Sequence, residues 1–412
     1  MTRSENDMTH RSYPALAVEE RQSSTCGRSP LNVTVVSSVE GFRSLRREWD
    51  GLLRASRSDC VFLTWEWLFT WWKWYGGSAQ LLILLLSDST GRLRGIAPLM
   101  SNRTAGVFRK LRIIGSESRV CSEYLDIIAE EGCEKDVARA ILDFLLDNHR
   151  SWDTFSLSSI RRGSPFLRAF EQLPEIRRLR SRRRTQYVAP YISLPETWDE
   201  LLARFGPRIR RNVRYYRKRL EKAFSVEFSS REVGLDTRHA INTMRRLQQK
   251  SISRKGIRGI FEDETFSNFH VEIMDLFHRN GWLYIVFVVC DGNPVAFWYA
   301  YLYAGTCYSY QTGFDLDYGS HSVGSVVHSF VLEDTIGKGI HTFDYLRGGQ
   351  EYKYHFANSA REMLEVSIFN NSWSSLLVRF VLAFGEHLRF CVSRLMGNNL
   401  KDKLKALMKR GS

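Results

Sequence analysis

The sequence predicts an α/β protein with two related lobes, each a mixed, mostly antiparallel sheet flanked by helices. Two observations lead to this fold class. A hairpin pattern occurs once in each half of the 412-residue chain, and each hairpin is followed by further strand-like runs and an amphipathic helical stretch. A chain of this length can also bury more than one core. We therefore expect a first lobe over residues 31–193 and a second over residues 194–370.

The two hairpins are the clearest sign of a duplication. An apolar strand in the first half ends at Asp88-Ser-Thr-Gly-Arg and returns from Leu93. A similar strand in the second half ends at Asp291-Gly-Asn and returns from Pro294. Turns that contain glycine between such runs are typical of β-hairpins. The helices that follow are expected at 135–148 and 323–336, with the boundary between the lobes near Pro190 to Pro195.

The first lobe opens with a strand at 33–36, a helix from about Val39 to Leu53, and an aromatic block at 62–75. Within that block Trp65, Leu68 and Trp72 recur at helical spacing. A tryptophan-rich stripe can form a platform for carbohydrate stacking. Helical spacing favours the other interpretation, in which these side chains pack in the core.

The two ends of the chain differ from the lobes in composition. Residues 1–30 are rich in polar residues and contain no continuous apolar run, which predicts a disordered leader and a cytoplasmic protein. Residues 371–412 combine an apolar stretch with a basic tail. This segment is either an amphipathic helix on the inner membrane surface or a terminal helix packed on the second lobe. The seven cysteines are scattered, so we expect no disulfide framework.

Two basic segments account for much of the net charge of +14. The first is an arginine cluster at 177–184, and the second extends from Arg208 to Lys222. On a helix, the second segment would have Ile209, Val213 and Leu220 on one face and basic side chains on another. The basic face can meet the phosphates of coenzyme A, an aminoacyl-tRNA, an anionic polysaccharide, or only solvent.

A small-residue segment lies between the strand-like run at 306–313 and the second-lobe helix. A helix that starts near Ser322 leaves its first backbone N–H groups unpaired, and small neighbours let an anion approach them. Ser322 is also a suitable N-cap. An ordinary strand-to-helix turn has the same composition, so the pattern alone leaves both interpretations open. The predicted donor-binding residues are Gly319, Ser320, Ser322, Val323, Gly324 and Ser325.

Five short motifs follow one another between residues 282 and 355. They are Gly292-Asn-Pro-Val-Ala-Phe, Tyr308-Ser-Tyr, Ser322-Val-Gly-Ser, Gly337-Lys-Gly-Ile, and Phe343-Asp-Tyr-Leu-Arg-Gly with Tyr352-Lys353. In this order they resemble the acyl-CoA-binding half of the GNAT superfamily. The similar branch has two tandem lobes and includes FemAB-type transferases and acetyltransferases associated with cellulose biosynthesis. The resemblance implies two tandem GNAT-like lobes, with acetyl-CoA or another acyl-CoA as co-substrate.

The chain departs from the best-known pyrophosphate motif of that superfamily, which has Gln or Arg, two residues, Gly, any residue, and Gly or Ala. Other chemistries fit less well. The segment Ser320-His-Ser-Val-Gly lacks the first glycine of a nucleophile elbow, and Ile336-Gly-Lys-Gly lacks the flanking residues of a P-loop. The sequence contains no paired His or Cys ligands at metal-binding spacing, so no metal is expected.

Acyl transfer from a thioester to an amine needs an anchored donor, a polarised carbonyl and a base. We expect Asp344 to orient or deprotonate the acceptor and Lys353 to hold a phosphate or carbonyl oxygen. The alternatives are a structural cap on the loop after Asp344 and a surface ion pair for Lys353. The predicted catalytic residues are Asp344, Lys353, Tyr352 and Tyr345; the predicted substrate contacts are Gln311, Asp315 and Arg347, with His321 as a further candidate.

Together these features predict an acyl-CoA-dependent N-acyltransferase with its catalytic centre in the second lobe. Its acceptor would be an amino group of a small molecule or of a cell-envelope polysaccharide component, held between the lobes. Two alternatives stay open. One is an aminoacyl-tRNA-dependent transferase of the FemAB type, which the basic helix supports. The other is a non-catalytic accessory protein of polysaccharide synthesis that docks through its C-terminal helix.

Overall fold

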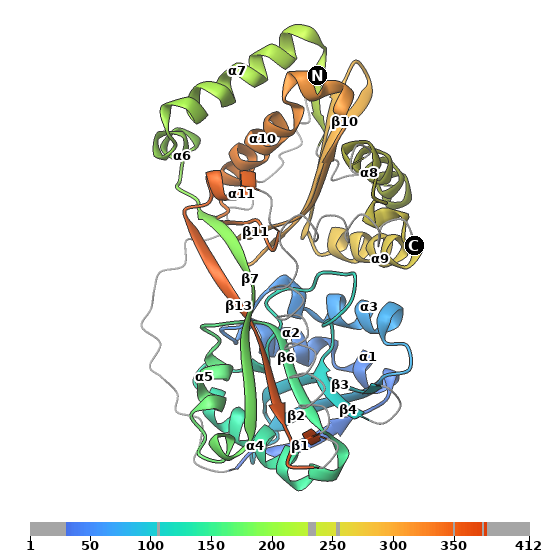
Figure 1. Cartoon of the computed structure of the whole chain (residues 1–412), viewed down its shortest axis with the longest axis vertical. Helices are drawn as coiled ribbons and strands as arrows, with labels where there is room; N and C mark the ends of the chain where they lie inside the picture. The colour runs from blue at the N-terminus through green and yellow to red at the C-terminus, as the bar shows by residue number, and fades with distance from the viewer. Residues whose placement is uncertain are drawn as a thin grey trace, which may run out of the picture.

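The computed structural model describes residues 30–104, 108–229, 236–252, 256–348, 351–372 and 375–376. The predicted leader at 1–30 lies outside this part except for Pro30. The predicted amphipathic helix and basic tail lie outside it almost entirely. Within the described part, the chain forms two lobes joined by long strands (Figure 1).

The first lobe combines six strands with five helices. Its strands are β1 (Asn32–Val36), β2 (Gln80–Ser87), β3 (Leu93–Thr104), β4 (Phe108–Ile113), β5 (Ile128–Ala129) and β6 (Thr154–Arg161). Its α-helices are α1 (Val39–Ser44), α2 (Arg46–Arg54), α3 (Trp65–Tyr75), α4 (Glu134–Asp147) and α5 (Pro165–Glu171). The helix predicted over 39–53 is thus two helices, because the chain turns at Leu45, whose N–H donates to the carbonyl of Phe42.

The second lobe is similar, with five strands and six α-helices among the described residues. Its strands are β8 (Val226–Ser229), β9 (Leu283–Cys290), β10 (Asn293–Tyr303), β11 (Thr306–Phe314) and β12 (Thr342–Asp344). Its helices are α6 (Trp198–Arg204), α7 (Pro207–Ala223), α8 (Thr237–Ile252), α9 (Glu264–Arg279), α10 (Val323–Gly337) and α11 (Glu351–Phe356). Two further strands, β7 (Arg180–Ser193) and β13 (Ser359–Phe369), join the lobes.

All thirteen strands of the described residues belong to one sheet, in the order β1-β2-β3-β4-β6-β13-β7-β12-β11-β10-β9-β8, with β5 paired to β3. In the first lobe, β1 to β4 are antiparallel and β6 is parallel to β4. In the second, β8 to β11 are antiparallel and β12 is parallel to β11. A helix, α4 or α10, precedes the parallel strand in each lobe. The duplication predicted from the two hairpins is therefore confirmed at the level of topology.

The two halves of the chain exchange one strand each. Strand β7 follows β6 in sequence but pairs with β12 of the second lobe. Strand β13 follows β12 but pairs with β6 of the first lobe, and β7 and β13 pair with each other along most of their length. Figure 1 shows these two strands side by side as they pass between the lobes. The sheet consequently continues from one lobe into the other.

The sheet of the second lobe separates two hydrophobic cores. Side chains alternate along β10, so that Phe297, Tyr299 and Tyr301 face one core, and Ala296, Trp298 and Ala300 face the other. The first core continues through α8 and α9 into the first lobe, where α3 packs on α9. The second core lies under α7 and α10. Packing thus ties the two lobes together on one face only.

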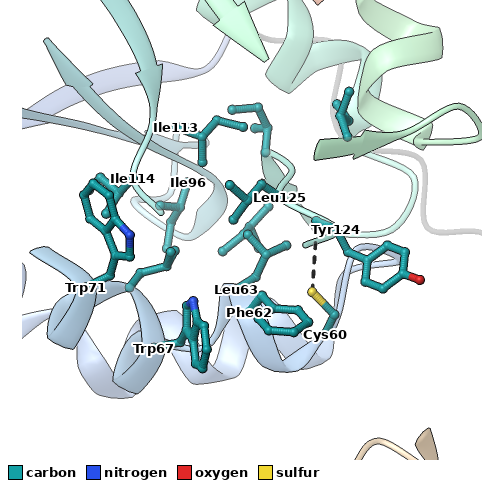
Figure 2. Close-up of a cluster of buried hydrophobic side chains, with 14 of the residues drawn as sticks. Cys60, Phe62, Leu63, Trp67, Trp71, Ile96, Ile113, Ile114, Tyr124 and Leu125 are labelled. Atoms are coloured by element: carbon teal, nitrogen blue, oxygen red, sulfur yellow. Dashed lines mark hydrogen bonds between the residues drawn. The ribbon is translucent and has the colours of Figure 1, made fainter. Parts of the chain in front are cut away.

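Most of the aromatic block forms α3, and its aromatic side chains are buried or half-buried against the first core, which supports core packing over a carbohydrate platform. The indole N–H groups of Trp67 and Trp71 donate to Ser122 Oγ at 2.9 Å and Ser118 Oγ at 2.8 Å. Both serines belong to the loop between β4 and β5, which packs against these rings. Figure 2 shows Leu125 within the cluster, whereas the ring of Tyr124 points away from it. The aromatic helix therefore positions a loop from which Tyr124 reaches the second lobe.

The N-cap of α3 offers a test of this support. Thr64 is buried; its hydroxyl donates to the carbonyl of Val61 and accepts from Trp67 N–H at 3.3 Å. Thr64→Ala removes both bonds and is expected to lower the free energy of unfolding by about 1–2 kcal/mol. Chemical denaturation followed by tryptophan fluorescence measures the change. Thr197→Ala, at the exposed N-cap of α6, should cost less; equal costs would contradict a special role for the α3 cap.

Candidate functional site

The predicted donor-binding residues lie where β11 leads into α10. A 3₁₀ helix, Leu316–His321, joins the two elements, and α10 begins at Val323 as predicted. Ser322 has φ 55° and ψ 37°, the left-handed region that a serine rarely adopts. Its side chain makes no capping hydrogen bond, so it marks the helix start without the side-chain cap expected of it. Ser325 N–H donates to the carbonyl of Ser322 at 2.9 Å, so the N–H groups of Val323 and Gly324 are the ones in the first turn without an acceptor among the described residues.

Strands β11 and β12 pair over only three residues. The register joins Thr306–Tyr308 to Thr342–Asp344, whereas β11 continues to Phe314. Past Tyr308, the edge of β11 has no strand partner within the described chain. Only its far end is closed: the hydroxyl of Ser251 bonds to both backbone groups of Phe314, at 2.5 and 2.6 Å. At about 3.3 Å per residue, the six residues from Ser309 to Phe314 span about 20 Å.

Asp344 ends β12 at the start of that open edge, and it is fully buried. Its Oδ2 accepts from the Tyr124 hydroxyl at 2.7 Å and from the Arg361 guanidinium, and its Oδ1 accepts from Leu346 N–H at 2.8 Å. Burial raises the pKa of Asp344, and the charge of Arg361 opposes that shift. The carboxylate thus caps the loop after β12, as one interpretation of the sequence held. Its part in proton transfer stays a prediction.

Two of these hydrogen bonds come from residues in unusual backbone conformations. Tyr124 has φ 56° and Leu346 has φ 54°, and neither is a glycine. Such conformations cost free energy and persist only where the surroundings impose them. Both residues donate to the same carboxylate, Tyr124 from the first lobe and Leu346 from the second. The junction of the lobes is therefore organised around Asp344.

Lys353 and Tyr345 are buried beside Asp344. The ammonium of Lys353 donates to the carbonyls of Tyr345 and Arg347 at 2.8 and 2.9 Å, and burial lowers its pKa to about 8. Lys353 is therefore not in a surface ion pair. The Tyr345 hydroxyl lies 2.7 Å from Nε2 of His328, a buried histidine stacked on Trp298. For Tyr352 the structure describes the backbone in α11, but the side chain lies outside the described part.

Glu123 is the residue that the sequence did not reveal. It lies in the first-lobe loop, 1% exposed, and its two carboxylate oxygens accept from Arg347 N–H at 2.8 and 3.0 Å. Burial raises its pKa to about 8. Asp344 adds to this shift, whereas Arg347 and Lys353 oppose it. A signal was present in the sequence, because Glu123 and Asp126 interrupt a segment whose other residues are largely apolar.

The remaining predicted contacts are occupied by neighbours. Gln311 accepts from Gln248 Nε2 of α8 at 3.2 Å, and buried Asp315 pairs with Lys250 and caps the 3₁₀ helix at Asp317 N–H. The Arg347 guanidinium lies 5.6 Å from the ring centre of Tyr187, a cation–π contact. His321 packs against Phe224 at the end of α7. Of these four, Arg347 is the one beside Glu123.

A small polar cavity of 110 Å³ opens between the lobes beside Asp344. Both halves of the chain contribute to it, including Tyr124 and Arg161 from the first and Tyr308 and Arg361 from the second. Ligand pockets usually measure roughly 300–1,000 Å³. In this conformation the cavity therefore accommodates only a small chemical group or a few waters.

Two features are absent from the described residues. No group of three or more His, Cys, Asp or Glu side chains is arranged to hold a metal ion there. No helix in the described ranges is long and apolar enough to cross a bilayer.

Comparison with known proteins bears on this geometry. Residues 207–354 match the family model described as an acetyltransferase (GNAT) domain. Comparison with curated protein sequences gave no match. Among solved structures, the chain is similar to FemX, with 11% identity and a TM-score of 0.58 over 79% of this chain and 96% of that one. At this identity the similarity concerns the fold.

Two further similarities are more distant. L-PGS from Bacillus licheniformis has 12% identity and a TM-score of 0.48 over 81% of this chain and 95% of that one. A tandem GNAT protein from the clavulanic acid biosynthesis pathway has 11% identity and a TM-score of 0.44, over 83% and 99% of the two chains.

The fold is thus that of two tandem GNAT-like lobes, and the matched domain contains the start of α10, Asp344 and Lys353. The domain match and the similarity to FemX support a transferase of the GNAT type.

Proposed function

We propose that the protein is an acyl-CoA-dependent N-acyltransferase that transfers an acyl group, in the simplest case acetyl, to an amine. One observation carries the proposal. The unpaired edge of β11 leads from the first turn of α10 to Asp344, over about 20 Å. An extended donor with phosphates at one end and a reactive acyl group at the other suits such a path.

The two ends of the path differ chemically in the way that such a donor requires. At α10, the N–H groups of Val323 and Gly324, which have no acceptor among the described residues, and the helix dipole favour phosphate. Gly324 leaves room there, since a Cβ would meet the Phe314 ring at 3.2 Å. Along the edge, unpaired backbone groups can bond to the amides of the pantetheine arm, as a sheet edge bonds to an added strand. The acyl group then lies near Asp344 and the junction of the lobes.

At that junction the chain offers a base and a donor. We assign Glu123 as the general base, because it is a buried carboxylate whose pKa lies close to neutrality. The acceptor nitrogen attacks the thioester carbonyl carbon, and its proton passes to Glu123. The C–S bond then breaks, and the departing CoA sulfur takes a proton from Glu123 or solvent to leave as the free thiol. Lys353 uses two of its three N–H donors within the protein, and the third can polarise the carbonyl. Asp344 and Arg361 hold these groups in position.

Titration calorimetry with acetyl-CoA tests the donor. Ser322→Asp adds a negative charge at the start of α10, where it would repel the diphosphate, and should weaken binding about tenfold or more. Ser38→Asp, which adds the same charge at the N-cap of α1 in the first lobe, should leave binding unchanged. If neither acetyl-CoA nor longer acyl-CoAs bind the wild-type protein, the proposal fails.

The similarity to FemX supports a second candidate, an aminoacyl-tRNA-dependent transferase of the FemAB type. Salt-sensitive binding of aminoacyl-tRNA without binding of acyl-CoA would favour it. Binding of neither donor would favour the accessory protein. The acceptor of the leading candidate is an amino group on a small molecule or on a polysaccharide component, and a screen for release of free CoA would find it.

A further inference from the structure

The two basic segments of the sequence have different surroundings in the structure. The arginine cluster lies largely on β7, where Arg183 pairs with Glu171 at 3.1 Å and Arg184 pairs with Glu365 at 2.5 Å. Neighbouring carboxylates therefore offset part of the charge of this cluster. The second segment forms α7, a helix of 17 residues on the outside of the second lobe (Figure 1).

One face of α7 is already packed. Ile209, Val213, Tyr216 and Leu220 lie in the second core, against α10. Arg217, at the side, pairs with Glu221 and Glu333. The exposed cations, none of which has a carboxylate partner among the described residues, are Arg208, Arg211, Arg214, Lys218, Arg219 and Lys222. We call these six residues the basic ridge.

The basic ridge is a narrow and straight array. At 100° per residue its six side chains fall within an arc of about 140°, on the side of the helix opposite the packed face. From Arg208 to Lys222 the helix rises about 21 Å. Tyr215, which is 54% exposed, lies inside this arc. The ridge thus presents six positive charges and one aromatic ring outward.

We propose that the basic ridge docks the protein onto an anionic membrane surface. Clusters of about four to eight basic residues on an amphipathic helix bind anionic lipid headgroups. Because the apolar face of α7 is already buried against α10, the helix adsorbs through charge and does not insert into the bilayer. Tyr215 supplies the kind of side chain that favours the interface between lipid and water.

The shape of the ridge fits a plane better than a nucleic acid. Contact with α10 along the buried face prevents α7 from entering a groove deeper than its own exposed side. The deep groove of double-stranded RNA is too narrow for side chains to read, and single strands require several stacking aromatics where this ridge has one. Binding to a flat anionic surface requires only a row of cations that projects from the protein, as the basic ridge does.

Docking in this orientation affects the donor end of the candidate site. Phe224, which follows α7, contacts Tyr318 and His321 of the 3₁₀ helix before α10, at ring distances of 5.2 and 5.1 Å. The start of α10 therefore lies at the same end of the lobe as the C-terminus of α7. A protein held by the ridge would have this end near the headgroups. The docking proposal itself does not depend on the proposed acyl transfer.

Flotation of the full chain with lipid vesicles tests the proposal. We expect binding to phosphatidylcholine vesicles that contain phosphatidylglycerol, no binding to phosphatidylcholine alone, and loss of binding as salt is raised above about 0.1 M. The variant Arg208→Gln, Arg211→Gln, Arg214→Gln, Lys218→Gln should bind at least about tenfold more weakly. Thermal unfolding checks that it is folded.

A matched control removes the same charge elsewhere. Arg47, Arg54, Lys135 and Arg150 are exposed in the first lobe, and their replacement by glutamine should leave vesicle binding intact. Equal loss in both variants would mean that net charge alone binds the vesicles and would overturn the proposal. Undiminished vesicle binding by the ridge variant would show that the protein contacts the membrane through another surface, and it would overturn the proposal. Tight binding of RNA without vesicle binding by the wild type would likewise overturn it.

Discussion

Glu123→Gln is expected to lower kcat/KM by about 10² to 10⁴-fold, the usual contribution of a general base. The amide keeps the shape of the side chain and its contact with Arg347 N–H, so the loss reflects proton transfer. In the wild type, the rate should rise with pH until Glu123 is ionised, with an apparent pKa of about 8. The variant should lack this rising limb. Release of free thiol from acetyl-CoA measures both.

The control for this prediction is Glu131→Gln. Glu131 is an exposed first-lobe carboxylate paired with Arg57, and its loss should change neither the rate nor its pH profile. A Glu123→Gln enzyme with the wild-type profile would exclude Glu123 as the base.

The same substitution has a second readout that needs no acceptor. The pKa of Glu123 is higher in the folded protein than in the unfolded chain. The stability linked to this group is therefore fully present at pH values below the pKa of the unfolded chain, and it is lost as the pH rises through about 8. Relative to Glu123→Gln, the wild type should therefore lose stability between about pH 5 and pH 8, by up to about 4 kcal/mol. Urea denaturation of both proteins across this range measures the difference. A pH-independent difference would show that Glu123 is ionised at an ordinary pKa.

Arg361→Ala is expected to destabilise the protein by about 3–5 kcal/mol. The substitution leaves the fully buried carboxylate of Asp344 without its charged partner, and a buried charge stripped of its partner is costly. It also removes the guanidinium stacked 3.9 Å from the Tyr191 ring centre. Denaturation followed by tryptophan fluorescence gives the free energy of unfolding.

Arg184→Ala provides the comparison. Arg184 of β7 pairs with Glu365 of β13, but its side chain is 51% exposed, so its removal should cost less than about 1 kcal/mol. If both variants lost a similar amount of unfolding free energy, the buried carboxylate of Asp344 would not need the charge of Arg361 for its stability. A partial recovery in Arg361→Lys would separate the loss of charge from the loss of stacking.

Local patterns predicted much of the fold because they are set by neighbouring residues. The two hairpins, the aromatic helix and α10 all follow from short-range periodicity and turn chemistry, and all are present. The strand exchange could not be predicted, because β7 and β13 have the same local character whichever strand they pair with. Pairing partners are decided by contacts far apart in sequence.

The candidate site also combines residues that local motifs predicted with residues that only distant contacts bring together. Asp344 and Lys353 were predicted from motifs within one lobe, and their catalytic roles stay predictions. Glu123 and Tyr124 come from a loop more than 200 residues away, and no local feature indicates that this loop meets β12. Gln311 and Asp315 were singled out by position, but their side chains bond to α8.

The exchanged strands bear on the origin of the molecule. Two separate copies of one lobe that traded their last strands would form a symmetric dimer with this same order of strands. Joining the genes of the two copies end to end would then yield the present chain. No intermediate in this history would need an unpaired strand edge at the junction of the two lobes. One active centre would suffice in such a fused pair, and the other copy would be free to diverge. The first lobe, whose Glu123 and Tyr124 reach the candidate site of the second lobe, fits a former partner subunit that became a permanent part of its neighbour.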